Sequence, residues 1–596
     1  MSRKVKNISF QEFENTLLRQ KETMYANNAS AAMVSRPPFK GAEAVALEMG
    51  LDRDQTDAFL LCARQTIEKE LYRRQLTAEK PDQMVFYLGG PGGTGKSAVL
   101  RALTTYMTSI GVRNQLRIAS QTGVAAGNVG GSTLHSLLRL PTTRRDKEER
   151  KQLPESVITN FKDVSLFFID EISMTGCSIL HEVSTKLKDA KSNTSEPFGG
   201  VDMIFAGDFY QLPPTGGDAL FKSVSLSEGD AKINTTMAHL GHLLFNDCTH
   251  AMFLTRQHRM TDLVYKEFVH RYREGETTKA AARDSLKLVI NALNPLSTGH
   301  LSHLKEDPVV IVQRNDLRFH INNTKAKQHA LALGQKLLIN VAYDKSKTSV
   351  STAVRREFLL FHDGPATCYL AGLLPLFIGM LVMIKKNYAT ELGISNGSTG
   401  VIYDIVIDPR ETIDYNSDEP HFLRHHPISV YVLVNTPKDK ETRQPEVKFH
   451  LHGLPANVFM MTRDENKKGR PLYATLTGSQ LKKPFNVSMQ REQYRFLPAY
   501  AITVNSSQGR TLESAVVCLE GDFKYNVKPY VMLSRLTNGD ALGIIGKVPP
   551  KIWSLTPNGD MKKFLKDKIF PKARATVANL NHSVLKPLEN TLRNAI

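Results

Sequence analysis

An octapeptide of the kind that surrounds phosphate groups, GPGGTGKS, runs from Gly90 to Ser97. It matches GxxxxGK[ST] in full, between an apolar run (MVFYLGG) and a helix-like run (SAVLRALTTYM). Glycines let backbone N–H groups curl around phosphate oxygens, where larger side chains would clash. We expect Lys96 to reach the terminal phosphates and the Ser97 hydroxyl to complete a Mg²⁺ shell. The residues predicted to hold the nucleotide here are Gly90, Gly92, Gly93, Thr94, Gly95, Lys96 and Ser97.

A pair of carboxylates stands where the apolar run LFFIDE ends, at Asp170 and Glu171. Asp170 is suited to hold Mg²⁺, directly or through water, and Glu171 to orient and deprotonate an attacking water. An adjacent Asp-Glu, rather than a lone Asp, favours a nucleotide hydrolase over a small-molecule kinase.

Later segments offer groups that could sense or stabilise a γ-phosphate. Gln211 stands just after the apolar run DMIFAGD, where a side chain at a strand end can sense the γ-phosphate. The segment LTRQHRM offers Arg256 and Arg259, and YVMLSRLT contains Arg535. Cations of this kind stabilise the charge that develops during phosphoryl transfer.

Two features of the sequence bear on which nucleotide base is bound. No NKxD guanine reader occurs in the chain, which disfavours GTP. Gln55, in LDRDQTDAF ahead of the phosphate loop, could read an adenine edge with its amide. A lone glutamine on an exposed helix is otherwise an ordinary surface residue.

The elements that must position these groups alternate between strands and helices, which predicts α/β folding around parallel sheets. A second α/β pattern begins near residue 308, and short strands separated by Gly, Asn, Ser and Pro interrupt it, which suggests a small β-barrel insertion. The tail combines basic residues with helical spacing, so both phosphate contact and a surface helix stay open. We expect an N-terminal extension at 1–49, a first domain at 50–250, a second domain at 251–334 and 490–548, a β-rich insertion at 335–489 and a basic tail at 549–596.

Bulk properties narrow the class of partner. The net charge of +18 favours a polyanion such as nucleic acid. The five cysteines form no CxxC pair, so we expect no metal cluster and a reducing compartment. The first residues do not read as a secretory signal. The apolar run 369–384 contains Gly372, Pro375 and Gly379, which favours buried strands over a membrane span.

Taken together, the motifs resemble those of superfamily-one DNA helicases of the Pif type (petite integration frequency) and their RecD-like cousins. The matching segments cover Leu51 to about Ile545. The segments GDFYQLPP and TGVAAGNVGGSTLHS are specific to this group, and SSQGRTL with VMLSRLT reinforces it. In order, the segments are LDRDQTDAF, GGPGGTGKS, SQTGVAAGNVGGSTLHS, FFIDEISM, GDFYQLPP, LTRQHRM, LPLFIGMLVMIKKN with NGSTG, AYAITVNSSQGRTL and YVMLSRLT.

The resemblance implies two RecA-like domains that bind ATP and Mg²⁺ between them, with a small barrel inserted in the second. Arg259, preferred over Arg256 because of its Arg-x-x-Asp spacing, and Arg535 would act as arginine fingers, and Gly509 would lie at the nucleotide. Single-stranded and forked DNA would be the track, followed 5′ to 3′. The residues implied to contact DNA are Thr122, Gly123, Thr133, His135, Thr503 and Gln508.

One departure from the family concerns the segment before SQG, where the family usually has His-Lys. Here Asn505 and Ser506 take that place, which removes a positive charge from the expected DNA path. We therefore expect intact ATP chemistry and a weaker grip on the strand. For His135 alone, a structural role is as good an interpretation as DNA contact.

Several biological settings are consistent with the resemblance. The resemblance implies repair, recombination, replication or telomere maintenance, in the nucleus or mitochondrion. A helicase of mobile-element origin and a nucleic-acid-binding ATPase that clamps without unwinding are the alternatives. RNA as the track and the oligomeric state are also undecided.

Overall fold

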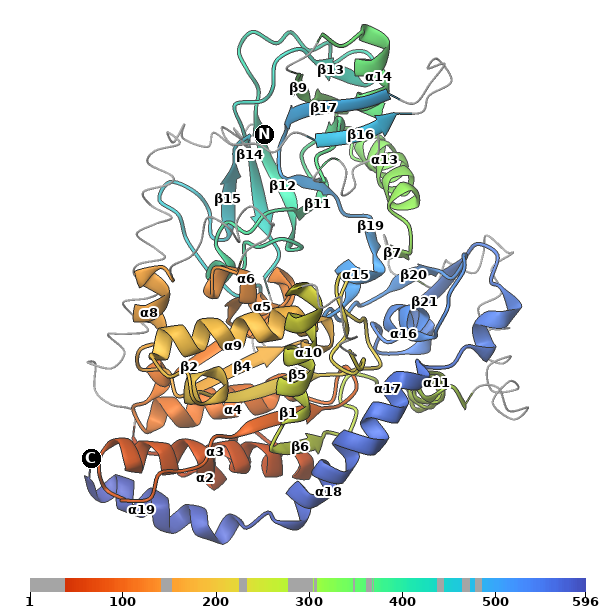
Figure 1. The fold of residues 1–596 in the computed structure, drawn as a ribbon. Helices are drawn as coiled ribbons and strands as arrows, with labels where there is room; N and C mark the ends of the chain where they lie inside the picture. The colour runs from red at the N-terminus through yellow and green to blue at the C-terminus, as the bar shows by residue number, and fades with distance from the viewer. Residues whose placement is uncertain are drawn as a thin grey trace.

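The structure is a computed structural model, and it describes residues 38–140, 153–224, 233–276, 304, 308–346, 349–360, 367, 369–436, 444–463, 472–476 and 485–595. Most of the extension predicted at 1–49 lies outside the described residues. Figure 1 shows two α/β units side by side, with a β-rich region above them and the last helices running along the base.

The first unit is built on a six-stranded, all-parallel sheet, as the alternating pattern predicted. Its order is β3 (Ser132–Thr133), β2 (Leu116–Ser120), β4 (Leu166–Asp170), β5 (Asp202–Gly207), β1 (Val85–Gly89) and β6 (His250–Phe253). The boundary predicted after residue 250 falls inside β6, so this sheet extends to Phe253.

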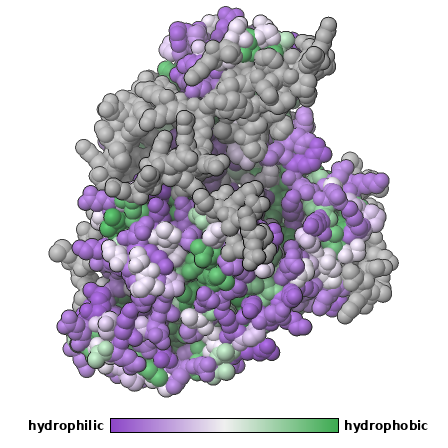
Figure 2. Space-filling view, viewed as in Figure 1, coloured by the Kyte–Doolittle hydropathy of each residue, from purple (hydrophilic) through white to green (hydrophobic). Residues whose placement is uncertain are grey.

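Helices cover both faces of this sheet, which explains why its strands are apolar throughout. In β1, Phe86 and Leu88 pack with the helices of one face, whereas Val85 and Tyr87 belong to the core of the other. The first face holds α2 (Ala42–Glu48), α3 (Arg53–Arg73) and α4 (Lys96–Ser109); the second holds α8 (Glu155–Phe161), α9 (Cys177–Lys191) and α10 (Ile233–Asn246). Figure 2 shows a mainly hydrophilic lower surface, with hydrophobic residues gathered near its middle.

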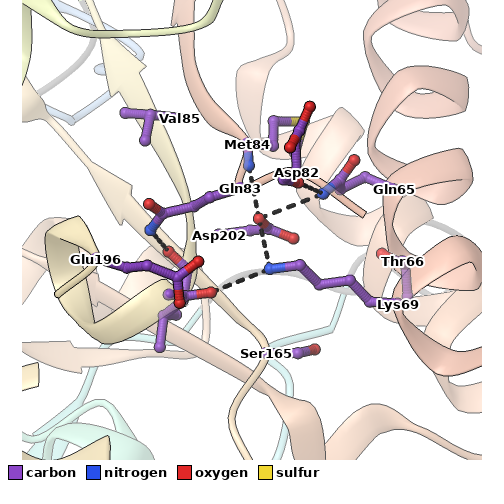
Figure 3. A network of polar contacts seen from close by, with 12 residues as sticks. Gln65, Thr66, Lys69, Asp82, Gln83, Met84, Val85, Ser165, Glu196 and Asp202 are labelled. Carbon is purple, nitrogen blue, oxygen red and sulfur yellow. Dashed lines mark hydrogen bonds and ion pairs between the residues drawn. The ribbon is translucent and has the colours of Figure 1, made fainter. Parts of the chain in front are cut away.

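A buried polar network fixes the start of β5 against β1 and α3. The Asp202 carboxylate, 2% exposed, accepts from the Met84 amide at 2.7 Å and pairs with Lys69 at 2.7 Å. Gln83 donates to the carbonyl of Val201 at 2.6 Å. Figure 3 shows Lys69, Gln65 and the Met84 amide around Asp202, with Gln83 beside them directed at a neighbouring carbonyl. The network lies at the amino ends of the strands, so it stabilises the sheet at the edge opposite the phosphate loop.

The second unit contains a four-stranded parallel sheet in the order β19 (Ala501–Thr503), β7 (Val309–Val312), β20 (Ala515–Cys518) and β21 (Leu542–Ile545). Its strands come from chain segments on both sides of the insertion, as predicted. Its helices are α11 (Leu263–Glu274), α13 (Asn315–Ala332), α15 (Val504–Ser507) and α16 (Val527–Leu533).

The inserted region is rich in β-structure, as predicted, and its strands form three small sheets within the described residues. The largest has the order β15 (Val458–Met461), β14 (Ser429–Val434), β12 (Thr399–Val406), β11 (Leu381–Ile384) and β18 (Phe496–Pro498). The described pairings do not close this sheet into a ring, so the barrel stays a prediction. The other strands are β8 (Leu338–Val341), β9 (Tyr343–Lys345), β10 (Leu373–Leu376), β13 (His421–Leu423), β16 (Leu472–Leu476) and β17 (Phe485–Glu492), beside helix α14 (Thr352–Leu360).

The apolar run at 369–384 forms β10 and β11, two short strands, as expected. Among the described residues, no helix has the length and apolar character needed to cross a membrane.

The C-terminal segment is helical and returns to the first unit. It comprises α17 (Gly559–Phe564), α18 (Phe570–Ala578) and α19 (Leu585–Ala595), which lie along the base in Figure 1. In α18, the Thr576 hydroxyl accepts from the amide of Ala251 in β6 at 3.1 Å. In α19, the buried Glu589 carboxylate accepts from the Ala42 amide at 2.7 Å, at the first residue of α2. The tail thus connects the edge of the first sheet to the helices that precede the phosphate loop.

Candidate nucleotide and nucleic-acid sites

The predicted phosphate loop connects β1 to α4, in the strand–loop–helix setting that the motif requires. Gly93 and Gly95 have φ of 94° and 87°, and a Cβ on Gly95 would lie 2.2 Å from the Gln55 amide nitrogen. Lys96 begins α4, and its ammonium donates to the carbonyls of Gly90 at 2.6 Å and Pro91 at 3.1 Å. Burial lowers the pKa of Lys96, although nearby carboxylates oppose that shift. Ser97 follows as the second residue of the helix.

Gln55 is packed against this loop and is only 4% exposed, so it is not a surface residue. It occupies the third position of α3 and completes a capping box with Asp52, accepting from the Asp52 amide at 3.1 Å. Its side-chain NH₂ donates to the Thr94 carbonyl at 3.0 Å and lies 3.1 Å from His258 Nε2. The helix cap therefore holds the Gln55 amide against the phosphate loop, and its role as an adenine reader stays a prediction.

The two predicted acids lie at the carboxyl end of β4. Burial, together with the charge of Glu171, raises the pKa of Asp170 to about 7. Glu171 has the left-handed backbone φ of 53°, which turns the chain sharply as it leaves the strand. Hard oxygen donors such as the Asp170 carboxylate and the Ser97 hydroxyl fit Mg²⁺, which keeps several waters and takes few protein ligands.

Arg259, Arg535 and Gln211 converge on one glycine of the phosphate loop. A Cβ on Gly92 would lie 3.2 Å from Arg259 Nη1, 3.4 Å from Arg535 Nη2 and 3.4 Å from Gln211 Nε2. Arg535 comes from the second unit, and Arg259 from the connection between β6 and α11. Arg256, the alternative finger, is exposed. The structure thus brings together the predicted γ-phosphate groups from distant parts of the sequence.

The buried Arg535 guanidinium and the partly buried Arg259 guanidinium lie close to one another. Arg259 Nη1 donates to the Ser534 carbonyl at 3.0 Å, and Arg535 donates to the Val531 carbonyl at 2.8 Å and the Ser534 hydroxyl at 2.7 Å. Burial and the charge of Arg535 lower the pKa of Arg259 to about 10, so it stays protonated at neutral pH. Two like charges held close together repel, and an anion above Gly92 would relieve that repulsion.

A charged cluster behind Gln211 was missed by the sequence reasoning. Asp208 accepts from Arg273 Nη2 at 2.7 Å, and the Arg273 guanidinium lies 3.7 Å from the centroid of the Tyr210 ring. Asp208 also contributes to the electrostatic environment of Lys96. One signal could have revealed it: Asp208 directly follows β5, just as Glu171 directly follows β4.

Gln257 and His258 were also missed, although both lie in the LTRQHRM segment. Gln257 Nε2 donates to the Gly92 carbonyl at 2.7 Å, and the His258 amide donates to the Gly93 carbonyl at 2.9 Å. His258 Nε2 lies 2.7 Å from the Asp52 carboxylate. These contacts hold the segment against the phosphate loop and so position Arg259.

A cavity of about 560 Å³ brings all six predicted DNA-contact residues together. It lies where the first unit, the second unit and the insertion meet. No carboxylate is among the described residues that line it, whereas Arg318, Lys385 and His135 are. The residues predicted to touch DNA that line it are Thr122, Gly123, Thr133, His135, Thr503 and Gln508.

Several of these residues also have structural roles. The hydroxyls of Thr122 and Thr133 accept from the amides of Ala125 and Ser136, so they cap α5 (Gly123–Asn128) and α6 (Leu134–Leu137). A Cβ on Gly123 would lie 2.9 Å from Asn387 Oδ1, so a glycine lets the insertion approach α5. Burial lowers the pKa of His135, which favours its neutral form.

Gln508 and Gly509 connect this cavity to the acidic strand end. Gln508 Nε2 donates to Glu171 Oε2 at 3.0 Å. A Cβ on Gly509, which the resemblance assigns to the nucleotide, would lie 3.7 Å from Glu171 Oε1. The SQG segment therefore packs on the predicted catalytic acid.

Comparison with known proteins agrees with these motifs. Residues 66–240 match the family model for PIF1-like helicase. The ATP-dependent DNA helicases Pif1 of Psychrobacter sp. and PIF1 of Danio rerio are each 25% identical to this chain, over 77% and 79% of its length. The chain spans 65% and 60% of those relatives, somewhat less than two thirds.

Solved structures show the same fold at lower identity. The Bacteroides Pif1 helicase in complex with ADP-AlF3 and ssDNA matches with a TM-score of 0.55 and 20% identity, over 84% of this chain and 96% of that one. The Candida albicans Pif1 helicase matches with a TM-score of 0.54 and 19% identity, over 84% and 98%. The expected resemblance is confirmed: the chain is similar to the PIF1-like helicases, and it has the α/β fold of the solved Pif1 structures.

Proposed function

We propose that this chain is an ATP-dependent DNA helicase that translocates on single-stranded DNA and unwinds duplexes. One observation carries the proposal most directly: Arg259, Arg535 and Gln211 meet over Gly92 of the phosphate loop. A nucleotide triphosphate there would place negative charge between the two units. Hydrolysis would remove part of that charge and loosen the two units, as a motor requires.

The chemical step needs a water in line with the γ-phosphorus. The water oxygen bonds to phosphorus, the bond to the β–γ bridging oxygen breaks, and the water proton passes to a Glu171 carboxylate oxygen. Lys96, Arg259 and Arg535 stabilise the charge on the phosphate oxygens. Mg²⁺, held by Ser97 and Asp170 when bound, supplies further neutralisation of that charge.

The cavity at the junction supports a single strand as the track. Its lining combines cationic, amide and hydroxyl groups without a described carboxylate, which suits a sugar–phosphate backbone. The Danio rerio and Psychrobacter relatives are named as DNA helicases, and the Bacteroides structure holds ssDNA. We extend this to DNA as the track here, with 5′-to-3′ movement and a role in genome maintenance in the nucleus or mitochondrion.

Matched forks test the substrate and the polarity together. We expect the protein with ATP and Mg²⁺ to unwind a DNA fork carrying a 5′ single-stranded overhang. Forks with a 3′ overhang, and the same forks in RNA, should be unwound far more slowly. Preferential unwinding of 3′ or RNA forks would overturn the polarity or the track.

Lys96→Ala separates a motor from a clamp. This change removes the cation that reaches the terminal phosphates, so we expect loss of both ATP turnover and unwinding while strand binding persists. Unwinding that continues without ATP turnover would contradict the motor. Turnover without unwinding in the unmodified protein would favour the clamping ATPase.

A further inference from the structure

The hydrogen bond between Gln508 and Glu171 joins the two candidate sites directly. Gln508 is 5% exposed and lines the predicted DNA cavity, and its Nε2 donates to Glu171 Oε2 at 3.0 Å. The two residues are 337 positions apart, one in each unit. The described structure therefore has a side chain of the strand site bound to the acid of the hydrolysis site.

This contact occupies part of the carboxylate of Glu171, the predicted general base. A base must offer an oxygen lone pair to the attacking water, and an amide N–H on the carboxylate occupies one such position. While the bond persists, it holds the Glu171 carboxylate toward the cavity instead of leaving it free to turn toward the nucleotide.

The oxygen of the same Gln508 amide indicates how a bound strand could replace the contact with Glu171. Gln508 Oε1 is buried and has no hydrogen-bond partner within the described structure. A buried polar atom without a partner is costly, on the order of 1–3 kcal/mol. A nucleic-acid strand in the cavity offers donors on its base edges for Oε1 and acceptors on bases, sugars or phosphates for Nε2. Both halves of the amide could then be satisfied at once.

We propose that Gln508 is a positioning residue that restrains Glu171 when the cavity is empty and releases it when a single strand is bound. The inference rests on the proposed function, because it needs ATP hydrolysis at Glu171 and a strand in the cavity. It makes occupancy of the track a condition for fast hydrolysis.

Removing the amide tests the restraint. We use two variants: Gln508→Ala, and Gln508→Met, which keeps the side-chain volume but has no N–H donor. Each should raise kcat for ATP hydrolysis without DNA about fivefold to tenfold, because one hydrogen bond to a charged group can account for an effect of that size. KM for ATP should stay unchanged, since no described contact joins Gln508 to the phosphate loop. The ratio of DNA-stimulated to unstimulated kcat should fall by a similar factor.

Asn128→Ala is the matched control. Asn128 Nδ2 donates to the Gly509 carbonyl at 3.2 Å, so this change also removes an amide contact to the SQG segment without touching Glu171. Its unstimulated kcat should equal that of the unmodified protein. A similar rise in Asn128→Ala would show that general loosening of the segment is responsible.

The outcomes separate the two proposals. Suppose that the unmodified protein hydrolyses ATP and that DNA stimulates this hydrolysis. If both Gln508 variants then keep the same ratio of DNA-stimulated to unstimulated kcat, or lose both kcat values together, the restraint is wrong and the proposed function stands. If the unmodified protein shows no hydrolysis that depends on Lys96, the proposed function fails. Circular dichroism of each variant verifies that the fold is retained.

Discussion

At the scale of single residues, Arg259 and Arg535 are the groups through which a bound nucleotide would link the two units. Arg535 is 1% exposed, and each guanidinium is held by backbone carbonyls or a hydroxyl rather than by a described carboxylate. Burial lowers the pKa of both groups. Neither guanidinium forms an ion pair within the described structure, although Glu171 and Asp208 lie near enough to act on Arg535, as expected for groups whose partner is the γ-phosphate.

The choice between Arg259 and Arg256 gives a matched pair of variants. Arg259→Ala should lower kcat for ATP by about 10³-fold or more, the range found for arginine fingers, with a smaller effect on KM. Arg256→Ala should stay within about twofold of the unmodified protein, because Arg256 is exposed and surface changes usually have small effects. Steady-state ATPase assays would measure both, and equal losses would contradict the assignment of Arg259.

The candidate site could be predicted from the sequence where its chemistry is local. The phosphate loop and Asp170–Glu171 are contiguous motifs, so backbone geometry and strand pairing alone place them. Contacts such as Gln55 to Thr94, Asp208 to Arg273 and Gln508 to Glu171 join residues 39, 65 and 337 positions apart. Such contacts depend on how complete elements pack, and a single sequence carries no direct record of that.

At the scale of elements, the alternating pattern predicted the parallel sheets because strands buried on both faces are apolar throughout. The pattern could not place the ends of the insertion, since β17 and β18 read like the strands on either side of them. β17 spans the predicted boundary after residue 489, and β18 pairs with β11 in the insertion's largest sheet. Strand pairing, which is non-local, decides which sheet a short strand joins.

The Asp202 network gives a test at this scale. Burial raises the pKa of Asp202 from 3.8 to about 6, against the opposing effect of Lys69. An acid whose pKa is higher in the folded state binds its proton more tightly there, so this stability is present at low pH and is lost as pH rises through about 6. The shift corresponds to about 3 kcal/mol.

Urea unfolding at a series of pH values measures this contribution. Between pH 4 and pH 7, the free energy of unfolding of the unmodified protein should fall relative to that of Asp202→Asn, which cannot titrate. The asparagine keeps an oxygen for the Met84 amide, so the sheet should still form. Parallel stability curves for the two proteins would show that the Lys69 pair cancels the effect of burial.

At the scale of the whole molecule, the chain ends of the described structure are packed together at the base of the first unit. Glu589 in α19 caps α2, and Arg593 lies 4.5 Å from the centroid of the Phe39 ring. The basic tail is thus engaged in folding, with Lys572 donating to the Cys248 carbonyl at 2.6 Å. Part of the net charge of +18 is therefore engaged in contacts within the fold, and we expect the proposed strand binding to depend on the cations near the cavity.

Ser506 tests how much that local charge matters. It lines the cavity, and its hydroxyl lies 3.2 Å from that of Thr503, at the place where the Pif-type family usually has a lysine. Ser506→Lys should tighten binding of single-stranded DNA at low salt. If the new ammonium neutralises one phosphate, the slope of log K against log salt should steepen by about 0.7, the value for a single strand. Fluorescence anisotropy over a salt series would measure both quantities.

Thr185→Lys, on the exposed side of α9 and outside the cavity lining, adds the same charge to the molecule and should leave the slope nearly unchanged. Identical salt curves for Ser506→Lys and the unmodified protein would mean that the strand does not pass Ser506, whereas equal steepening in both variants would mean that the net charge of the molecule, rather than the cavity, governs binding.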